Sequence, residues 1–385
     1  RQYRPRRNLR IRSIELNARP SAWLILCCAV FATTPLFACK LPVFRYALER
    51  WAVDRYRMVA IVNEGEEDAT RDAVERLQVI DPDRANVEVE VVKLGQLSDD
   101  ELWQVEGIEE VGDASRLLVY YPMRHGKSKL CWSGDLTTET VDGWLDSPLR
   151  RAIVSDLVSG VSAVWIQLDS DDEDASQQFA DGVQQSLAQA KKEIEIPEGV
   201  IPRADAASYL SEHPEASMDD VLRCDVPLRV DFRIRRLDRT DPDEWATVEL
   251  IEGMIGESDQ PILIPTFGRG RMLDAIEAED ADRDALLAAC RYMVSECSCT
   301  VKALNPGTDM LLAADWQESL GTDVVMVNLQ TDEQREPELI QIPGGSEGDL
   351  VEVEDGREFR IGWYTIGLIA VLGSVIAWKL VRARG

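Results

Sequence analysis

The chain is poor in histidine and in positive charge. It has 385 residues, of which only His125 and His213 are histidines, and its 42 lysines and arginines face 70 aspartates and glutamates, giving a net charge of −28. So acidic a surface repels phosphate groups, which excludes nucleic acid as a partner. Two separated histidines also leave zinc without its usual nitrogen ligands. A merely solvated acidic surface and a surface that docks a basic partner or cations both stay open.

The first 38 residues are predicted to be a secretory signal segment. Residues 1–19 are rich in arginine, residues 22–32 are apolar, and Leu36-Phe37-Ala38-Cys39 follows. A basic region, an apolar core and a small residue before the cleavage point are typical of such signals. The tetrapeptide Leu36-Phe37-Ala38-Cys39 also resembles a bacterial lipobox, which makes Cys39 a candidate for lipidation. Ordinary cleavage after Ala38 and an uncleaved anchor remain alternatives.

A second apolar segment lies near the C-terminus. Residues 361–378 are uncharged and are followed by Lys379, Arg382 and Arg384. At ~1.5 Å per residue such a helix approaches the ~30 Å of a bilayer core. The positive-inside rule places the basic tail in the cytoplasm. We therefore predict a single-pass protein of the cell membrane, with a transmembrane helix and tail at 361–381, an acidic linker at 331–360 and a body in the periplasm or another extracytoplasmic space.

Between these segments the apolar pattern makes two similar passes, each predicting a strand, a helix, a second strand, a hairpin and a final helix. In the first pass the elements are expected at 56–62, 68–79, 87–94, 117–121, 129–133 and 138–145. In the second they are expected at 163–168, 175–194, 228–237, 262–267, 271–273 and 282–294, after a leading helix at 148–158. Residues 199–225 are interpreted as a linker or an excursion.

Two short segments are interpreted as local structure rather than as sites. The acids at 169–174 fail to match a calcium loop and are expected to cap the helix that follows. The sequence Gly268-Arg269-Gly270-Arg271 is typical of a tight turn in the second hairpin.

The order of elements resembles the thioredoxin fold. We therefore predict an α/β protein with two tandem thioredoxin-like domains, 39–147 and 148–330, plus one C-terminal transmembrane helix. In redox-active members of that family a Cys-x-x-Cys motif follows the first strand. The equivalent turns here, 63–67 and 169–173, contain no cysteine. The resemblance implies binding modules rather than oxidoreductases. Residues 41–51 are also similar to uncharacterised envelope membrane proteins of bacteria, which brings no known activity.

The cysteines are the main chemical signal. Outside the signal segment they are Cys39, Cys131, Cys224, Cys290, Cys297 and Cys299. Six cysteines in an exported protein favour disulfides, with 15 possible pairings, and Cys131, Cys224, Cys290, Cys297 and Cys299 are the disulfide candidates. The cluster of Cys290, Cys297 and Cys299 leaves a thiol redox pair or a soft-metal site open as alternatives.

No catalytic constellation is visible in this sequence. We expect a membrane-anchored extracytoplasmic binding or scaffold protein without thiol–disulfide catalysis. It would need no cofactor, and its partner would be a protein of the cell envelope, with another membrane protein as one option. The alternative is a thiol-redox or soft-metal handling protein that uses Cys290, Cys297 and Cys299.

Overall fold

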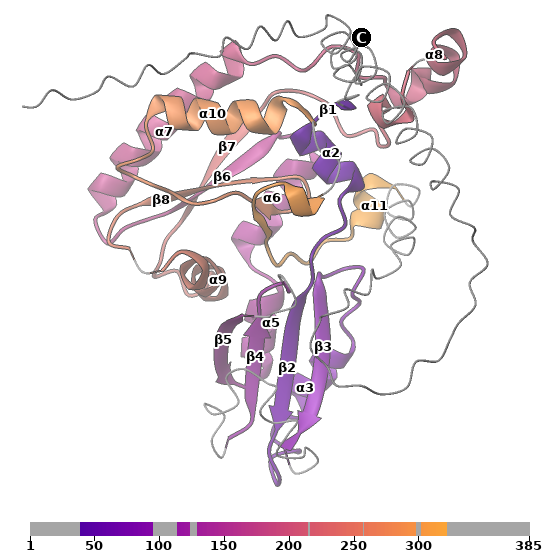
Figure 1. The fold of residues 1–385 in the computed structure, drawn as a ribbon. Coiled ribbons are helices and arrows are strands. Elements are labelled where there is room, and N and C mark those ends of the chain that lie inside the picture. Colours follow the sequence, from indigo (N-terminus) through magenta and orange to yellow (C-terminus); the bar gives the residue numbers. More distant parts are fainter. Residues whose placement is uncertain are drawn as a thin grey trace, which may run out of the picture. The chain divides into compact units, whose positions relative to one another are not determined.

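The computed structural model describes residues 39–94, 114–123, 129–214, 216–256, 258–297 and 302–321. These residues form two mixed β-sheets, with helices packed against them, and a short two-stranded antiparallel sheet (Figure 1). In this part of the chain no helix is both long enough and apolar enough to cross a membrane. The predicted signal segment, the acidic linker at 331–360 and the predicted spanning helix lie outside the described residues.

The first sheet has the strand order β3-β2-β4-β5. Its central strand β2 (Tyr56–Val62) runs parallel to β3 (Val87–Lys93) and antiparallel to β4 (Arg116–Tyr120), which pairs antiparallel with β5 (Leu130–Asp135). Helix α3 (Arg71–Gln78) connects β2 to β3, and α5 (Thr138–Leu145) follows β5.

The second sheet repeats this arrangement. Strand β6 (Ala163–Leu168) runs parallel to β7 (Phe232–Leu237) and antiparallel to β8 (Ile262–Phe267), which pairs antiparallel with β9 (Arg271–Met272). Helix α7 (Glu173–Glu193) connects β6 to β7, α9 (Trp245–Ile255) precedes β8, and α10 (Arg283–Val294) follows the hairpin. Strand β12 (Thr308–Asp309) pairs with β9, and β10 (Ile276–Glu277) pairs with β8.

Both sheets therefore place a parallel strand pair beside an antiparallel hairpin, with the first strand inside the sheet. The mixed α/β class predicted from the sequence is confirmed, and the strand order in each half is thioredoxin-like.

Capping side chains explain where several helices begin. Ser147 accepts a hydrogen bond from the Arg150 amide and is followed by proline at the first position of α6 (Pro148–Val158). Asp172 accepts from the Ala175 amide at 2.9 Å at the start of α7. The predicted capping role is thus confirmed for Asp172, and Glu173 and Asp174 lie in the first turn of the helix.

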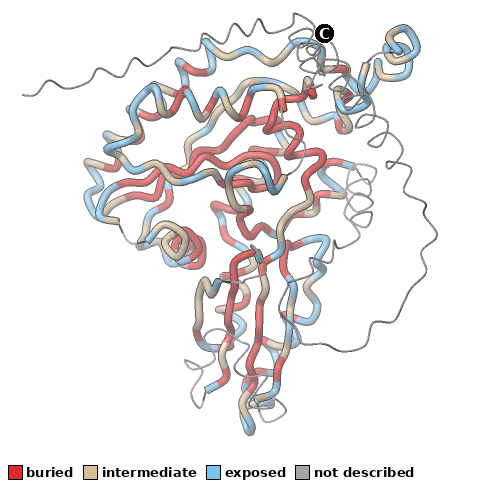
Figure 2. The backbone as a smooth tube through the Cα atoms, viewed as in Figure 1, coloured by how far each residue is buried: buried red, intermediate tan, exposed pale blue. Residues whose placement is uncertain are grey.

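One hydrophobic core joins the two sheets. It contains Met58 and Leu117 of the first sheet together with Ile166 and Ile264 of the second, and Ile153 of α6 lies in the same cluster. Helices α7 and α10 pack on the other face of the second sheet. Figure 2 shows the resulting continuous burial of the central strands.

Three tryptophans fill the space between the first sheet and α9. Trp132 of β5, Trp144 of α5 and Trp245 of α9 have ring centroids 5.4 to 5.8 Å apart. A Cβ on Gly143 would lie 2.7 Å from Nε1 of Trp245, so only glycine fits there. The two halves of the chain are therefore in close side-chain contact at this cluster.

The N-terminal segment packs with the second sheet. Strand β1 (Cys39–Pro42) pairs antiparallel with β11 (Glu296–Cys297), and every residue of α2 (Val43–Arg50) is buried. Its apolar side chains belong mainly to the core beneath α7 and α10. The sequence-based division placed this segment in 39–147, with the first sheet, whereas its packing partners come from the second half of the chain.

Charged side chains of α2 hold a distant loop. Arg45 and Glu49 are both 0% exposed and form an ion pair of 2.8 Å. The Glu49 carboxylate also accepts the backbone N–H groups of Arg223 at 2.9 Å and Cys224 at 3.3 Å, and Arg45 donates to the Cys224 carbonyl at 2.9 Å. The segment 199–225 therefore includes a fixed loop as well as α8 (Ala206–Glu212).

The turn between β8 and β9 also contacts α2. Gly268 and Gly270 both have positive φ, and the Gly270 amide donates to the Phe267 carbonyl at 3.1 Å. A Cβ on Gly268 would lie 2.6 Å from Cβ of Ala47. The tight turn predicted at 268–271 is confirmed, and its glycine permits the close approach of α2.

A charge network ties the C-terminal part of the described chain to the start of β2. Lys302 forms ion pairs with Asp54 at 2.8 Å and with Asp309, and Arg271 lies 3.4 Å from Asp54 and 3.3 Å from Asp309. Beyond it, α11 (Trp316–Leu320) buries Trp316 in the shared core.

Candidate functional site

The turn after β6 is where a thioredoxin-like protein would hold its dithiol, and here it holds an aspartate. Asp169 is 6% exposed, and its carboxylate accepts hydrogen bonds from Gln167 at 2.8 Å and Arg236 at 2.9 Å. Arg236 lies on β7 directly beside Gln167 in the parallel register, and Arg239 donates to the Asp169 carbonyl at 2.6 Å. This turn is a salt-bridge network with no thiol to activate.

The turn after β2 is also polar and hydrogen bonded. The Glu66 carboxylate accepts the Ser115 amide at 2.7 Å, and the Asn63 amide donates to the Ser115 hydroxyl at 2.9 Å. Hydrogen bonds from Ser115 lower the pKa of Glu66. These hydrogen bonds therefore hold the turn after β2 against Ser115, the residue that precedes β4.

Three of the disulfide candidates lie in different surroundings. Cys131 is on β5 beside Tyr121, the Cys224 thiol donates to Glu49 at 3.4 Å, and Cys290 is fully buried on α10. All three are free thiols. Burial raises the pKa of Cys131 and of Cys290 to about 12, and that of Cys224 to about 11. Their disulfide bonding stays a prediction, and these thiols are poor nucleophiles near pH 7.

The predicted soft-metal or redox cluster is only partly visible. Cys290 lies on α10 and Cys297 on β11, both buried, whereas Cys299 lies outside the described residues. Among the described residues no group of three or more histidine, cysteine, aspartate or glutamate side chains is arranged to hold a metal ion.

Cys39, the lipidation candidate, is the first residue of β1. It is 5% exposed, and its Sγ donates to the Asp219 carbonyl at 3.0 Å. Its lipidation is untested and stays a prediction.

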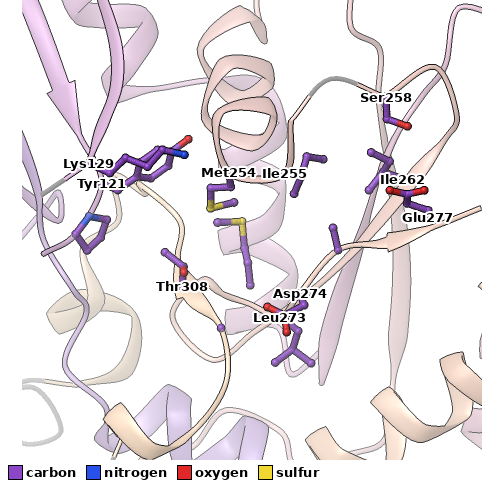
Figure 3. Close-up of a pocket in the computed structure, with 14 residues that line it drawn as sticks. Tyr121, Lys129, Met254, Ile255, Ser258, Ile262, Leu273, Asp274, Glu277 and Thr308 are labelled. Atoms are coloured by element: carbon purple, nitrogen blue, oxygen red, sulfur yellow. The ribbon is translucent and has the colours of Figure 1, made fainter. Parts of the chain in front are cut away.

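A cleft between the two halves of the body is the candidate binding site (Figure 3). Its volume is about 520 Å³. The first half contributes Tyr121, Pro122 and Lys129 at the β4–β5 hairpin. The second half contributes the end of α9, the start of β8, the segment from β9 to β10, and Gly307 with the first residue of β12.

Hydrogen bonds to the end of α9 fix the first wall of this cleft. The Tyr121 hydroxyl donates to the Leu250 carbonyl at 2.7 Å, and the Lys129 ammonium donates to the Gly253 carbonyl at 2.8 Å. Lys129 Nζ also lies 5.7 Å from the centroid of the Tyr121 ring. A side chain on Gly253 would collide with the Tyr121 hydroxyl, so glycine permits this contact. The wall is therefore in place before any ligand arrives.

The second half supplies apolar and acidic side chains. The apolar members of the lining include Met254, Ile255 and Leu273, all partly exposed, and the acids Asp274 and Glu277 are exposed (Figure 3). Methionine side chains adapt to varied shapes. Since the one lysine of the lining is already hydrogen bonded, the cleft offers an apolar surface beside two carboxylates.

None of these cleft residues is among the sites expected from the sequence. They come from segments far apart in the chain, so spacing alone gives no signal. The one usable signal is the apolar run 245–255, which forms α9 and ends at the cleft.

Comparisons with known proteins add little. No family model and no curated protein matches the chain. Among solved structures, full-length ERdj5 has a TM-score of 0.20 at 10% identity, covering 70% of this chain and 34% of its own. Human ERp44 has a TM-score of 0.19 at 7% identity, covering 69% of this chain and 62% of its own. The chain thus spans about a third of ERdj5 and less than two thirds of ERp44. So low a TM-score assigns neither family nor function. What the strand order and the cleft define is a mixed α/β protein with thioredoxin-like topology and a cleft of about 520 Å³.

Proposed function

We propose that this chain is a membrane-anchored extracytoplasmic binding or scaffold protein that holds a segment of a partner protein and does not catalyse thiol–disulfide exchange. The observation that carries the proposal is the cleft of about 520 Å³ between Tyr121 and Leu273. Ligand pockets commonly have such a volume and combine apolar walls with a few polar groups.

The chemistry of the lining indicates what the partner presents. Met254, Ile255 and Leu273 offer a surface for one large apolar side chain, because they are partly exposed and line the same cleft. Asp274 and Glu277 would attract a lysine or arginine next to that side chain. The net charge of −28 favours encounter with a basic segment over an acidic one. We therefore propose that the occupant is a basic peptide segment of an envelope protein.

The turns after β2 and β6 support binding rather than redox catalysis. Thiol–disulfide exchange requires an accessible thiolate, usually at a helix N-terminus. At the start of α7 the chain instead has Asp169 in an ion pair with Arg236 at 2.8 Å. The buried Cys290 gives no support to the thiol or metal alternative. An insulin-reduction assay of the purified protein is expected to show no turnover above buffer, and turnover lost on replacing Cys297 and Cys299 by serine would favour that alternative.

The location outside the cytoplasm is part of the proposal and rests on the sequence. The basic apolar start, the apolar segment at 361–378 and the basic tail support it. The resemblance to tandem thioredoxin-like envelope proteins of bacteria that lack the dithiol motif agrees with this location.

The cleft is tested with two labelled peptides of equal length. One carries a single leucine in a lysine–serine background, and the other carries the same leucine in a glutamate–serine background. Fluorescence anisotropy at about 0.15 M salt reduces long-range charge effects, because the Debye length is then ~8 Å. We expect saturable binding of the lysine peptide only, weakened ~10-fold by Ile255→Ser, since this substitution removes most of an apolar contact without changing the charge of the cleft.

The matched control is a pair of exposed acids close together in the sequence. Glu277 lines the cleft and Glu279 does not, and both are exposed. Glu277→Lys should weaken the lysine peptide several-fold, whereas Glu279→Lys, with the same change in net charge, should have little effect. Equal effects of the two substitutions, or binding unaffected by Ile255→Ser, would show that the acidic surface as a whole attracts the peptide and would refute a cleft-specific partner.

A further inference from the structure

Two cysteines face each other across the short β1–β11 ladder. Cys39 and Cys297 are Cα partners at one end of this antiparallel ladder, and the register shifts between Cys39 and Pro42. They are 5% and 1% exposed, and both belong to the core beneath α7 and α10. This pair is one of the 15 pairings that the sequence leaves open, although Cys39 is treated there mainly as a lipidation candidate.

The contacts around the pair fix the register. Lys40 forms an ion pair of 2.9 Å with Glu296, although the two residues are 256 positions apart. On the other side of the ladder, the Val43 amide donates to the Ser295 carbonyl at 3.0 Å. Strand β1 therefore cannot slip by one residue without losing both contacts.

The ladder geometry suits a covalent link. Directly opposed residues of an antiparallel pair have Cα atoms about 4.5 or 5.5 Å apart and side chains on the same face. A disulfide needs Cα atoms about 4.4–6.8 Å apart. We propose that Cys39 and Cys297 form a disulfide that locks β1 onto β11 and closes the body of the protein on itself.

The reaction is thiol–disulfide exchange with an external oxidant. A thiolate of the pair attacks the disulfide of an oxidised dithiol protein or of glutathione disulfide, and one thiol of the oxidant leaves. The second cysteine then attacks the mixed disulfide, so that the Cys39–Cys297 bond forms and the oxidant departs with both electrons and both protons. In the reduced state the Cys39 thiol donates to the Asp219 carbonyl, and the disulfide replaces this hydrogen bond.

The surroundings of Cys39 determine when the bond forms. Burial raises the pKa of Cys39 to about 11, so little thiolate exists at pH 7 once β1 is in place. Oxidation is therefore expected while the segment is still exposed, and the finished bond is protected from reductants by the same burial.

The proposal goes beyond the proposed function and is independent of the cleft. One Sγ atom cannot carry both a lipid and a disulfide, so the proposal also excludes lipidation of Cys39. Loss of peptide binding would leave the disulfide untouched, and loss of the disulfide would leave the cleft residues in place, because Cys39 and Cys297 do not line the cleft.

The test uses the full chain, kept in mild detergent and refolded in a glutathione and glutathione disulfide buffer. Thiols are alkylated, and the protein is digested with trypsin without reduction and examined by mass spectrometry. We expect a peptide ending at Lys40 joined to the peptide that contains Cys297, two hydrogen atoms lighter than the sum of the two. The peptide with Cys297 also contains Cys299, and two variants show which of them forms the link. The link should persist in Cys299→Ser and vanish in Cys297→Ser.

Thermal unfolding provides a second readout. Under oxidising conditions Cys297→Ser should unfold roughly 5–10 °C below Cys299→Ser, because it lacks a crosslink that closes a very long loop. Addition of a reductant during refolding should remove this difference. A Cys297–Cys299 link, a lipid mass on Cys39, or alkylation of both cysteines after refolding with glutathione disulfide would each overturn the proposal.

Discussion

Replacing Glu49 by leucine should destabilise the body strongly. The substitution leaves the guanidinium of Arg45 buried without its anion, and it removes the acceptor of the Arg223 and Cys224 amides. Breaking one partner of a buried ion pair typically costs ~3–5 kcal/mol. Taking about 4 kcal/mol, and a urea dependence of ~3 kcal/mol/M for a body of this size, the unfolding midpoint should fall by about 1.3 M.

A second variant separates the charge effect from a packing effect. Combining Glu49→Leu with Arg45→Met replaces both charged groups by apolar groups. Such a replacement of a buried ion pair often leaves the free energy of unfolding little changed. We therefore expect the double variant to be more stable than either single variant. Urea unfolding of residues 39–356, followed by tryptophan fluorescence, measures the unfolding midpoints of the two single variants and the double variant.

The control is an exposed ion pair. Arg76 and Asp142 have side chains 52% and 47% exposed, so Asp142→Asn should cost less than about 1 kcal/mol. The reasoning is refuted if Glu49→Leu lowers the midpoint no more than Asp142→Asn, or if the effects of the two α2 substitutions simply add.

Four further predictions concern the junction, the thiols and the membrane. Gly143→Ala should cost ~1–3 kcal/mol, measured by urea unfolding, because its methyl group collides with Trp245. Above pH 9 the unfolded chain releases the Cys290 proton, whereas the folded protein retains it to about pH 12, so the free energy of unfolding falls with rising pH. Between pH 9 and about pH 11 the urea midpoint should therefore fall less in Cys290→Ala than in the unchanged protein. A reporter fused after Gly385 should be active only in the cytoplasm. A protein truncated after Gly356 should be released by osmotic shock, and its retention, abolished by Cys39→Ser, would identify a lipid anchor instead.

Segments with strong local signals were predictable from the sequence. The helices at 138–145 and 148–158 have the predicted bounds, because Thr137 and Ser147 cap them with their own side chains. The strands at 163–168 and 262–267 also have the predicted bounds, since they are buried along their whole length.

Helices without a polar face were not predictable in this way. Helix α2 buries every residue, so Arg45 and Glu49 do not mark a solvent side. Helix α9 has buried residues around most of its circumference and no side-chain cap at Glu244. An amphipathic pattern requires a broad solvated face, whereas α2 has none and Glu249 is the one exposed residue of α9.

The cleft escapes prediction for a different reason. Lys129 and Leu273 meet only because the shared core brings the β4–β5 hairpin against the end of α9. The sequence predicts the elements that carry these residues but contains no local pattern for their meeting. The absence of a dithiol motif, in contrast, is visible in the sequence, because that motif is contiguous in redox-active thioredoxin-like proteins.

If the chain is exported as proposed, the packing of α2 imposes an order on its folding. A chain that crosses the membrane from its N-terminus delivers α2 early, but the Val221 carbonyl that binds Arg50 lies 171 residues later. The first sheet has its pairing strands close together in the sequence and can form while the second is still arriving. Until the second half arrives, Phe44 and Leu48 of α2 lack the apolar residues against which they pack. The exposed apolar surface is one that a chaperone outside the cytoplasm would recognise. The folded state of the body therefore forms late, because it requires the second half of the chain.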